Sequence, residues 1–203
     1  MWRGSGYELS SDLTWPGTKE PIEEAIRLLE AGLLIAGENA LLYASLGYMY
    51  WEYVRFGIKQ EDALAKAEEF AKKALNLDRD SALAYVVQGV IHYLSGRVKE
   101  AYRCCKHACA IGQNDFLPLY YLSWMYLAIG RTADAFPLAR RVIDLDPLNP
   151  VVHGFPSFIH FYLGQFQEAT EGAQLLSEGI PLSTTLSIRA ELSETTGIEA
   201  QRL

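Results

Sequence analysis

One six-residue motif occurs three times in this chain at a constant spacing. Each copy begins with glycine and ends with an acidic residue followed by alanine, and Gly96, Gly130 and Gly164 follow one another at intervals of 34 residues. An internal period of this length is typical of stacked-repeat proteins rather than of closed globules. Because such an array has no central pocket built from distant loops, it usually works by offering a long surface to a partner.

The composition narrows the class of protein further. Half of the residues are hydrophobic and the formal net charge is -7, which argues against a nucleic-acid partner. The longest apolar stretch, 117–129, is shorter than the roughly 20 residues that a membrane span needs, and no apolar signal core follows the N-terminus. The three cysteines fit a reducing compartment better than a disulfide framework. We therefore expect a cytoplasmic protein without a membrane span.

Each copy of the motif lies between two segments whose apolar residues recur with the period of an α-helix. The apolar residues on either side of Gly96 recur at spacings of three and four, which places them on one face of a helix. The repeating unit is therefore helix, glycine turn, helix. Small residues in register would let the two helices approach closely: Gly47, Gly89, Ser123 and Ser157 in the first helices, and Ala25, Ala67, Ala101, Ala135 and Ala169 in the second.

These residues resemble the tetratricopeptide repeat (TPR). The resemblance rests on the Leu46-Gly47 pair between Tyr43 and Tyr50, on the alanine in register, and on the closing run 145–147 of Leu-Asp-Pro. It covers Glu20 to about Thr196 and implies an all-α, right-handed solenoid of antiparallel helix pairs, a TPR-like superhelix. More loosely, the chain resembles repeat regions of bacterial signalling proteins.

The register predicts the domain organisation. We expect an irregular N-terminal lead-in at 1–19 and a TPR-like helical domain at 20–203, made of a half repeat at 20–39, full repeats at 40–81, 82–115, 116–149 and 150–183, and a terminal helix at 184–203. Ten helices are expected, at about 20–35, 40–54, 61–75, 81–95, 98–111, 116–129, 132–145, 151–163, 166–177 and 183–196. About eight extra residues around Val54–Glu61 predict either a contact loop or a longer helix pair with no role.

The first helices of such a stack line its inner wall. Aromatic residues dominate the positions that meet this groove, and lysine, asparagine and arginine do not occur there, so a clamp for a C-terminal carboxylate is not expected. The candidate peptide-binding residues are Tyr48, Trp51, Tyr93, Tyr120, Trp124, Phe158, Phe161 and Tyr162. These side chains either receive a partner or pack between neighbouring repeats.

Catalytic and metal-binding chemistry has little support in the sequence. Cys105 and Cys109 are one helical turn apart, but zinc needs four converging ligands, and the register makes both cysteines small core residues. His92 and His160 replace tyrosines of other repeats, which predicts packed histidines with a hydrogen bond. We expect no catalytic residue, no metal and no cofactor.

The sequence thus predicts a non-enzymatic protein-interaction scaffold. Its concave aromatic groove would bind the apolar face of a helix or peptide, and the scaffold would be a module of a bacterial signalling or regulatory protein. The alternative is a self-association module, in which the same surface forms a homodimer of the parent protein.

Overall fold

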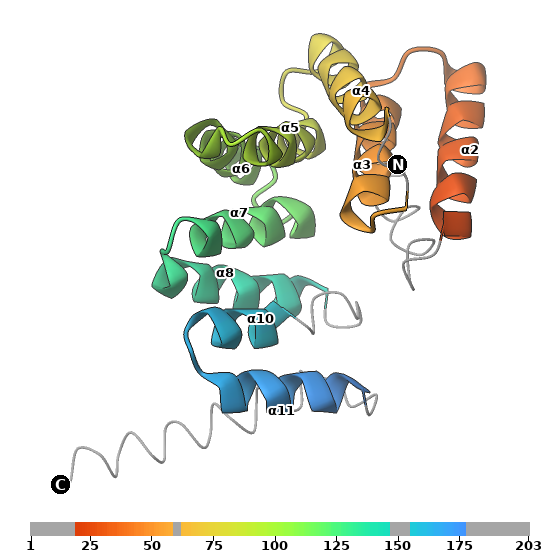
Figure 1. Cartoon of the computed structure of the whole chain (residues 1–203). Coiled ribbons are helices and arrows are strands. Elements are labelled where there is room, and N and C mark those ends of the chain that lie inside the picture. The colour runs from red at the N-terminus through yellow and green to blue at the C-terminus, as the bar shows by residue number, and fades with distance from the viewer. Residues whose placement is uncertain (1–18, 59–61, 147–154, 178–203) are drawn as a thin grey trace, which may run out of the picture. The chain divides into compact units, whose positions relative to one another are not determined.

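The structure is all helical in the part of the chain that it describes. This computed structural model describes residues 19–58, 62–146 and 155–177, and its regular elements there are α-helices (Figure 1). The helices are α2 (Lys19–Ala36), α3 (Ala40–Arg55), α4 (Ala63–Leu77), α5 (Ala82–Leu94), α6 (Val98–Ile111), α7 (Phe116–Ala128), α8 (Thr132–Leu145), α10 (Phe155–Tyr162) and α11 (Phe166–Ser177). They belong to two compact units, Met1–Tyr121 and Leu122–Leu203.

The helix bounds agree closely with the expected ones. From α2 to α8, and again at α11, each end lies within two residues of the position that the sequence predicts. The expected start at Val151, the expected last helix at 183–196 and all of the expected lead-in at 1–19 except Lys19 lie outside the described residues. Lys19 itself is the first residue of α2. The division of the chain into one half repeat and four full repeats stays a prediction.

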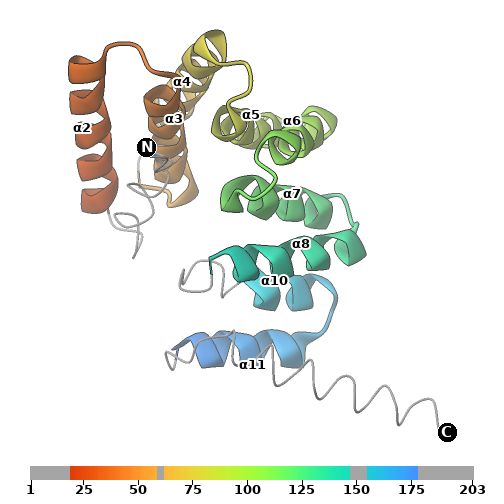
Figure 2. The ribbon, with the colours of Figure 1, turned by 180° about the vertical axis from the view of Figure 1, so that it is seen from behind.

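Consecutive helices pack as hairpins. In the first unit α3 pairs with α4 and α5 pairs with α6, and in the second unit α10 pairs with α11 (Figures 1 and 2). This pairing is the helix, glycine turn, helix unit that the periodicity predicts.

The three repeated glycines close one and the same turn. Gly96, Gly130 and Gly164 have φ of 74°, 76° and 75°, in the left-handed region that glycine enters without a steric penalty. At the first of them the amide of Gly96 donates to the carbonyl of Tyr93 at 2.9 Å, and the amide of Arg97 donates to the carbonyl of His92 at 2.9 Å. The other two turns repeat both bonds, which together satisfy carbonyls at the helix end.

Small residues let the paired helices approach closely, as predicted. A Cβ atom added at Gly89 would lie 2.7 Å from Sγ of Cys105, and one at Gly47 would lie 3.2 Å from the carbonyl oxygen of Ala67. In the second unit the hydroxyl of Ser123 donates to the carbonyl of Ala135 at 2.8 Å. The alanines of the second helices are at most 3% exposed at Ala25, Ala67, Ala101 and Ala135.

The extra residues of the first hairpin are divided between a helix and a turn. Gly57 has φ of 65°, and its amide and that of Ile58 make the same two bonds as the repeated glycines, to Val54 and Tyr53. Gly57 follows Gly47 by 10 residues, whereas Gly96 follows Gly89 by 7, so α3 is longer by about one turn. The other extra residues lie between Gly57 and α4, and 59–61 are outside the described residues.

Candidate functional site

Four predicted groove residues come together in the second unit. Trp124 of α7 lies with its ring centroid 6.3 Å from Phe158 and 6.4 Å from Tyr162, both on α10. The ring of Phe161 is 6.1 Å from that of Tyr162 and 5.6 Å from that of Phe166, the first residue of α11. We call these five residues the aromatic surface.

Most of the aromatic surface is open to solvent. The exposed fractions are 54% for Phe158, 57% for Phe161, 49% for Tyr162 and 61% for Phe166, while Trp124 is half-buried. Phe166 was not among the predicted groove residues, because it opens a second helix. Its position directly after the glycine turn at Gly164 is the signal that relates it to α10.

The predicted groove residues of the first unit are mostly packed. Tyr48 and Trp51 are buried, and the indole nitrogen of Trp51 donates to the hydroxyl of Tyr121 at 2.6 Å. Tyr120 is half-buried against Phe116, with ring centroids 5.6 Å apart. Tyr48 and Trp51 therefore have little surface to offer a partner.

Of the four predicted groove residues in the first unit, Tyr93 has the side chain most exposed to solvent. Its side chain is 39% exposed near the end of α5. The role of these four residues in binding stays a prediction.

A buried ion pair lies beside Trp51. Glu52 is 1% exposed, and its Oε2 accepts a 2.5 Å bond from a guanidinium nitrogen of Arg55. Burial opposes the charge of Arg55, but Glu52 and the hydroxyls of Tyr48 and Tyr121 outweigh it and raise the pKa of Arg55 above its usual value. Among the residues that the structure describes, Oε1 of Glu52 and Nε of Arg55 find no hydrogen-bond partner. The sequence shows only an ordinary pair three residues apart, so burial could not be predicted.

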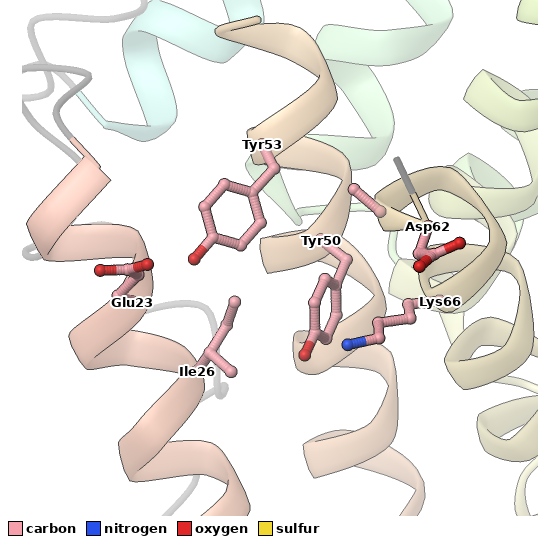
Figure 3. Close-up of a pocket in the computed structure, with 7 residues that line it drawn as sticks. Glu23, Ile26, Tyr50, Tyr53, Asp62 and Lys66 are labelled. Carbon is pink, nitrogen blue, oxygen red and sulfur yellow. The ribbon is translucent and has the colours of Figure 1, made fainter. Parts of the chain in front are cut away.

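A pocket of about 330 Å³ lies among α2, α3 and the start of α4 (Figure 3). Its lining residues are Glu23, Ile26, Tyr50, Tyr53, Asp62, Ala63 and Lys66. The hydroxyl of Tyr53 points toward the carboxylate of Glu23, and the ammonium of Lys66 lies 5.0 Å from the ring centroid of Tyr50. Burial, and then the charge of Glu23, raises the pKa of Tyr53 to about 12.

The chain is similar in sequence to part of a known transcriptional regulator. No family model matches the chain. The transcriptional regulator HilA of Salmonella typhimurium is 23% identical over 146 residues, which are 71% of this chain and 26% of HilA. The chain thus spans about a quarter of the length of the curated relatives that it matches.

Solved structures share the arrangement of helices at low sequence identity. The thermophilic TPR protein TTC0263 of Thermus thermophilus has a TM-score of 0.63 at 15% identity, covering 94% of this chain and 97% of that one. The hetero-tetramer Cut9–Hcn1 of the APC/C has a TM-score of 0.58 at 16% identity, covering 85% of this chain and 31% of that one. Yeast Tom70 has a TM-score of 0.54 at 20% identity, covering 80% of this chain and 33% of that one.

The chain has the TPR fold. The predicted fold class, an all-α fold of TPR-like helix pairs, is confirmed by the described helices and by these structures.

Of the two cysteines predicted to be core residues, Cys105 is in the core of this TPR fold, whereas Cys109 is only half-buried. Cys105 is fully buried against Gly89, and burial raises the pKa of its thiol, which keeps the sulfur protonated and unreactive. Cys104 and Cys109 are half-buried. Within the described ranges, no three His, Cys, Asp or Glu side chains gather in a way that could hold a metal ion.

The two described histidines that replace tyrosines differ in their surroundings. Nδ1 of His160 lies 2.8 Å from Oε1 of Gln165, as expected for a packed histidine with a hydrogen bond. Nδ1 of His92 is buried and has no such partner in the described part of the chain, and burial followed by the charge of Arg97 lowers the pKa of His92. His153 lies outside the described residues.

None of the TPR helices that the structure describes combines the length and the apolar character that crossing a bilayer requires.

Proposed function

We propose that this chain is a non-enzymatic scaffold that binds an apolar helix or peptide of a partner protein on its aromatic surface. The observation that carries the proposal is the contiguous set of rings in the second unit, from Trp124 through Phe158, Tyr162 and Phe161 to Phe166. Soluble proteins seldom leave several large aromatic side chains exposed side by side without a use for them.

The size of the aromatic surface supports a binding role. An aromatic side chain has roughly 150–250 Å² to bury. With Phe158, Phe161, Tyr162 and Phe166 each about half exposed, on the order of 400 Å² of mainly apolar area faces solvent. This area matches the largest patch on a typical monomer, about 300–600 Å², which is often functional.

The arrangement of the rings suits a helical partner. Phe158, Phe161 and Tyr162 occur at intervals of three and four on α10, so they form a stripe along one helix face. The rings already pack on one another, and binding would therefore order few additional side chains. An amphipathic helix that lays its apolar face on such a stripe is a recurring mode of recognition.

The remaining predicted residues have a different place in the proposal. Tyr93 and Tyr120 expose part of their rings and would offer a separate contact in the first unit, where the buried Tyr48 and Trp51 would support the fold.

A module of a bacterial regulatory protein is the context that we propose. The similarity to about a quarter of the transcriptional regulator HilA of Salmonella typhimurium supports a bacterial setting in which such a region serves a larger regulatory protein. We propose that this protein acts in the cytoplasm. The Cut9–Hcn1 structure contains a second protein chain, which supports a protein as partner. Self-association of the parent protein is the alternative.

The experiment is a binding scan. An array of amphipathic peptides of about 15 residues is screened against the full chain, and each positive peptide is titrated by fluorescence anisotropy. Replacing both Phe161 and Phe166 by serine should weaken binding at least tenfold, since each loses a large apolar contact. Leu145→Ser is the matched control, because this leucine of α8 is 39% exposed but lies outside the aromatic surface.

Sedimentation equilibrium of the same proteins separates the two candidates. A monomer whose peptide affinity falls in the double variant and not in the control supports the scaffold. A dimer that dissociates in the double variant supports self-association instead. Equal peptide affinities in all three proteins would end the proposal.

A further inference from the structure

The pocket of the first unit arises where the first hairpin departs from the repeat. The additional turn of α3 carries Tyr53, and the long connection to α4 ends at Asp62, and both residues line the pocket (Figure 3). Its volume of about 330 Å³ is at the lower end of the range for ligand sites. It can hold a group of the size of one amino-acid side chain.

Asp62 is held in an unusual conformation at this pocket. Its φ is 61°, and among the described residues it is the one non-glycine residue with a left-handed backbone. Such strain is often found at functional sites. Asp62 is also the N-cap residue of α4, yet its side chain makes no capping hydrogen bond. Within the described residues, the carboxylate of Asp62 is therefore not used for capping and can pair with another group.

The second carboxylate of the pocket belongs to Glu23 and lies near the hydroxyl of Tyr53. Oε1 of Glu23 pairs with Lys19 at 3.2 Å on the exposed side of α2. On the other side the hydroxyl of Tyr53, which is 5% exposed, points toward Glu23. Because its pKa is raised to about 12, Tyr53 keeps its proton and can hold the carboxylate in place as a donor.

A cation of the chain itself already lies in the pocket. The ammonium of Lys66 is 5.0 Å from the ring centroid of Tyr50, and that ring also stacks on Phe70 with centroids 5.6 Å apart. Asp62 and Lys66 are one helical turn apart, but the ion pairs of the described residues do not include this pair. Lys66 is exposed, so it can leave the ring and pair with Asp62.

We propose that this pocket binds the basic side chain, arginine or lysine, of a partner protein. The cationic head pairs with Glu23, the aliphatic stem lies against Ile26 and the ring of Tyr50, and Lys66 moves to Asp62. Every charge is then paired. Two carboxylates, two tyrosine rings and a net charge of -7 favour a cation over an anion. Lys66 acts as the internal substitute that the ligand displaces.

The test is an NMR titration of the full chain with ¹³C-labelled tyrosine rings. The probe is N-acetyl-arginine amide, the matched neutral probe is N-acetyl-citrulline amide, and the anionic probe is N-acetyl-glutamate amide. The arginine probe should shift the ring signals of Tyr50 and Tyr53, which are assigned by Tyr→Phe variants. Citrulline has nearly the same shape without the charge and should bind at least tenfold more weakly.

Two variants make the test decisive. Lys66→Met removes the competing cation and should raise the affinity for the arginine probe about threefold to tenfold. Glu23→Gln should lower it about tenfold. Lys73→Met is the matched control: Lys73 lies 5.2 Å from the ring centroid of Phe70 but outside the pocket, and its loss should leave the affinity unchanged.

The opposite results would overturn the proposal. Loss of arginine binding in Lys66→Met, or tighter binding of the glutamate probe, would make the pocket an anion site. Absence of any shift at Tyr50 and Tyr53 at probe concentrations that saturate a weak site would show that no basic side chain binds. Neither result depends on the aromatic surface, because the Phe161 and Phe166 double variant should bind the arginine probe normally.

Discussion

Trp51 and Tyr121 are 70 residues apart in the chain, and a buried hydrogen bond of 2.6 Å joins them. Tyr121→Phe would leave the indole N–H of Trp51 buried without an acceptor, which typically costs about 1–3 kcal/mol. Urea unfolding should show a loss of that size. Tyr85→Phe is the control, because the ring of Tyr85 keeps its contact with His107 and should change stability by less than about 0.5 kcal/mol. Equal effects of the two changes would contradict the role of this bond.

Two glycines in different backbone conformations predict substitutions with opposite effects on stability. Gly130→Ala should destabilise the protein by about 1 kcal/mol, because φ is 76° there and a Cβ atom disfavours that conformation. Gly32→Ala should stabilise it by roughly 0.5–1 kcal/mol, since Gly32 lies inside α2 and a Cβ there meets Leu42 at an ordinary 3.4 Å. Thermal unfolding measures both changes, and a stabilised Gly130→Ala would contradict the turn geometry.

The crossing of α5 and α6 depends on the absence of a side chain at Gly89. Gly89→Ala would bring a Cβ atom to 2.7 Å from Sγ of Cys105, and such overpacking typically costs about 1–3 kcal/mol. Adding Cys105→Ala removes the sulfur and should recover part of the loss. Denaturant melts of the two single variants and the double variant test this, and strictly additive losses would contradict direct contact between the two sites.

The buried ion pair should be sensitive to the loss of one partner. Arg55→Leu would leave the carboxylate of Glu52, which is 1% exposed, without its cation, and this should cost about 3 kcal/mol. The double variant Glu52→Met with Arg55→Leu should be considerably more stable than the single variant. Urea melts compare the two. A single variant as stable as the wild type would show that the pair is not desolvated.

Tyr53 should couple stability to alkaline pH. Its pKa is raised to about 12 in the folded chain, above the ordinary tyrosine value of about 10. The folded state therefore keeps a proton that the unfolded state loses, so this contribution is complete below about pH 10 and is lost as the pH rises toward 12. Unfolding followed between pH 9 and 12, compared with Tyr53→Phe, should show a smaller decline in the variant.

The sequence predicts local features of this protein better than distant ones. Helix ends and glycine turns depend on residues close in sequence. The turn at Gly96 could therefore be predicted from the six-residue motif that it begins. The exposure of a side chain depends on which residues, distant in sequence, pack against it. Trp51 and Phe158 occur in similar patterns, yet Trp51 is buried near Tyr121 whereas Phe158 is 54% exposed. The burial of Glu52 is unpredictable for the same reason.

The lengthened first hairpin shows where a repeat of this kind tolerates additional residues. The close crossing of Gly47 with Ala67 is kept although about eight more residues separate them than in the hairpin of Gly89 and Ala101. Added length is taken up at the tip of the hairpin, beyond the helix contact. The end of a hairpin that lies away from the helix crossing can therefore be lengthened without disturbing the contact that holds the two helices together.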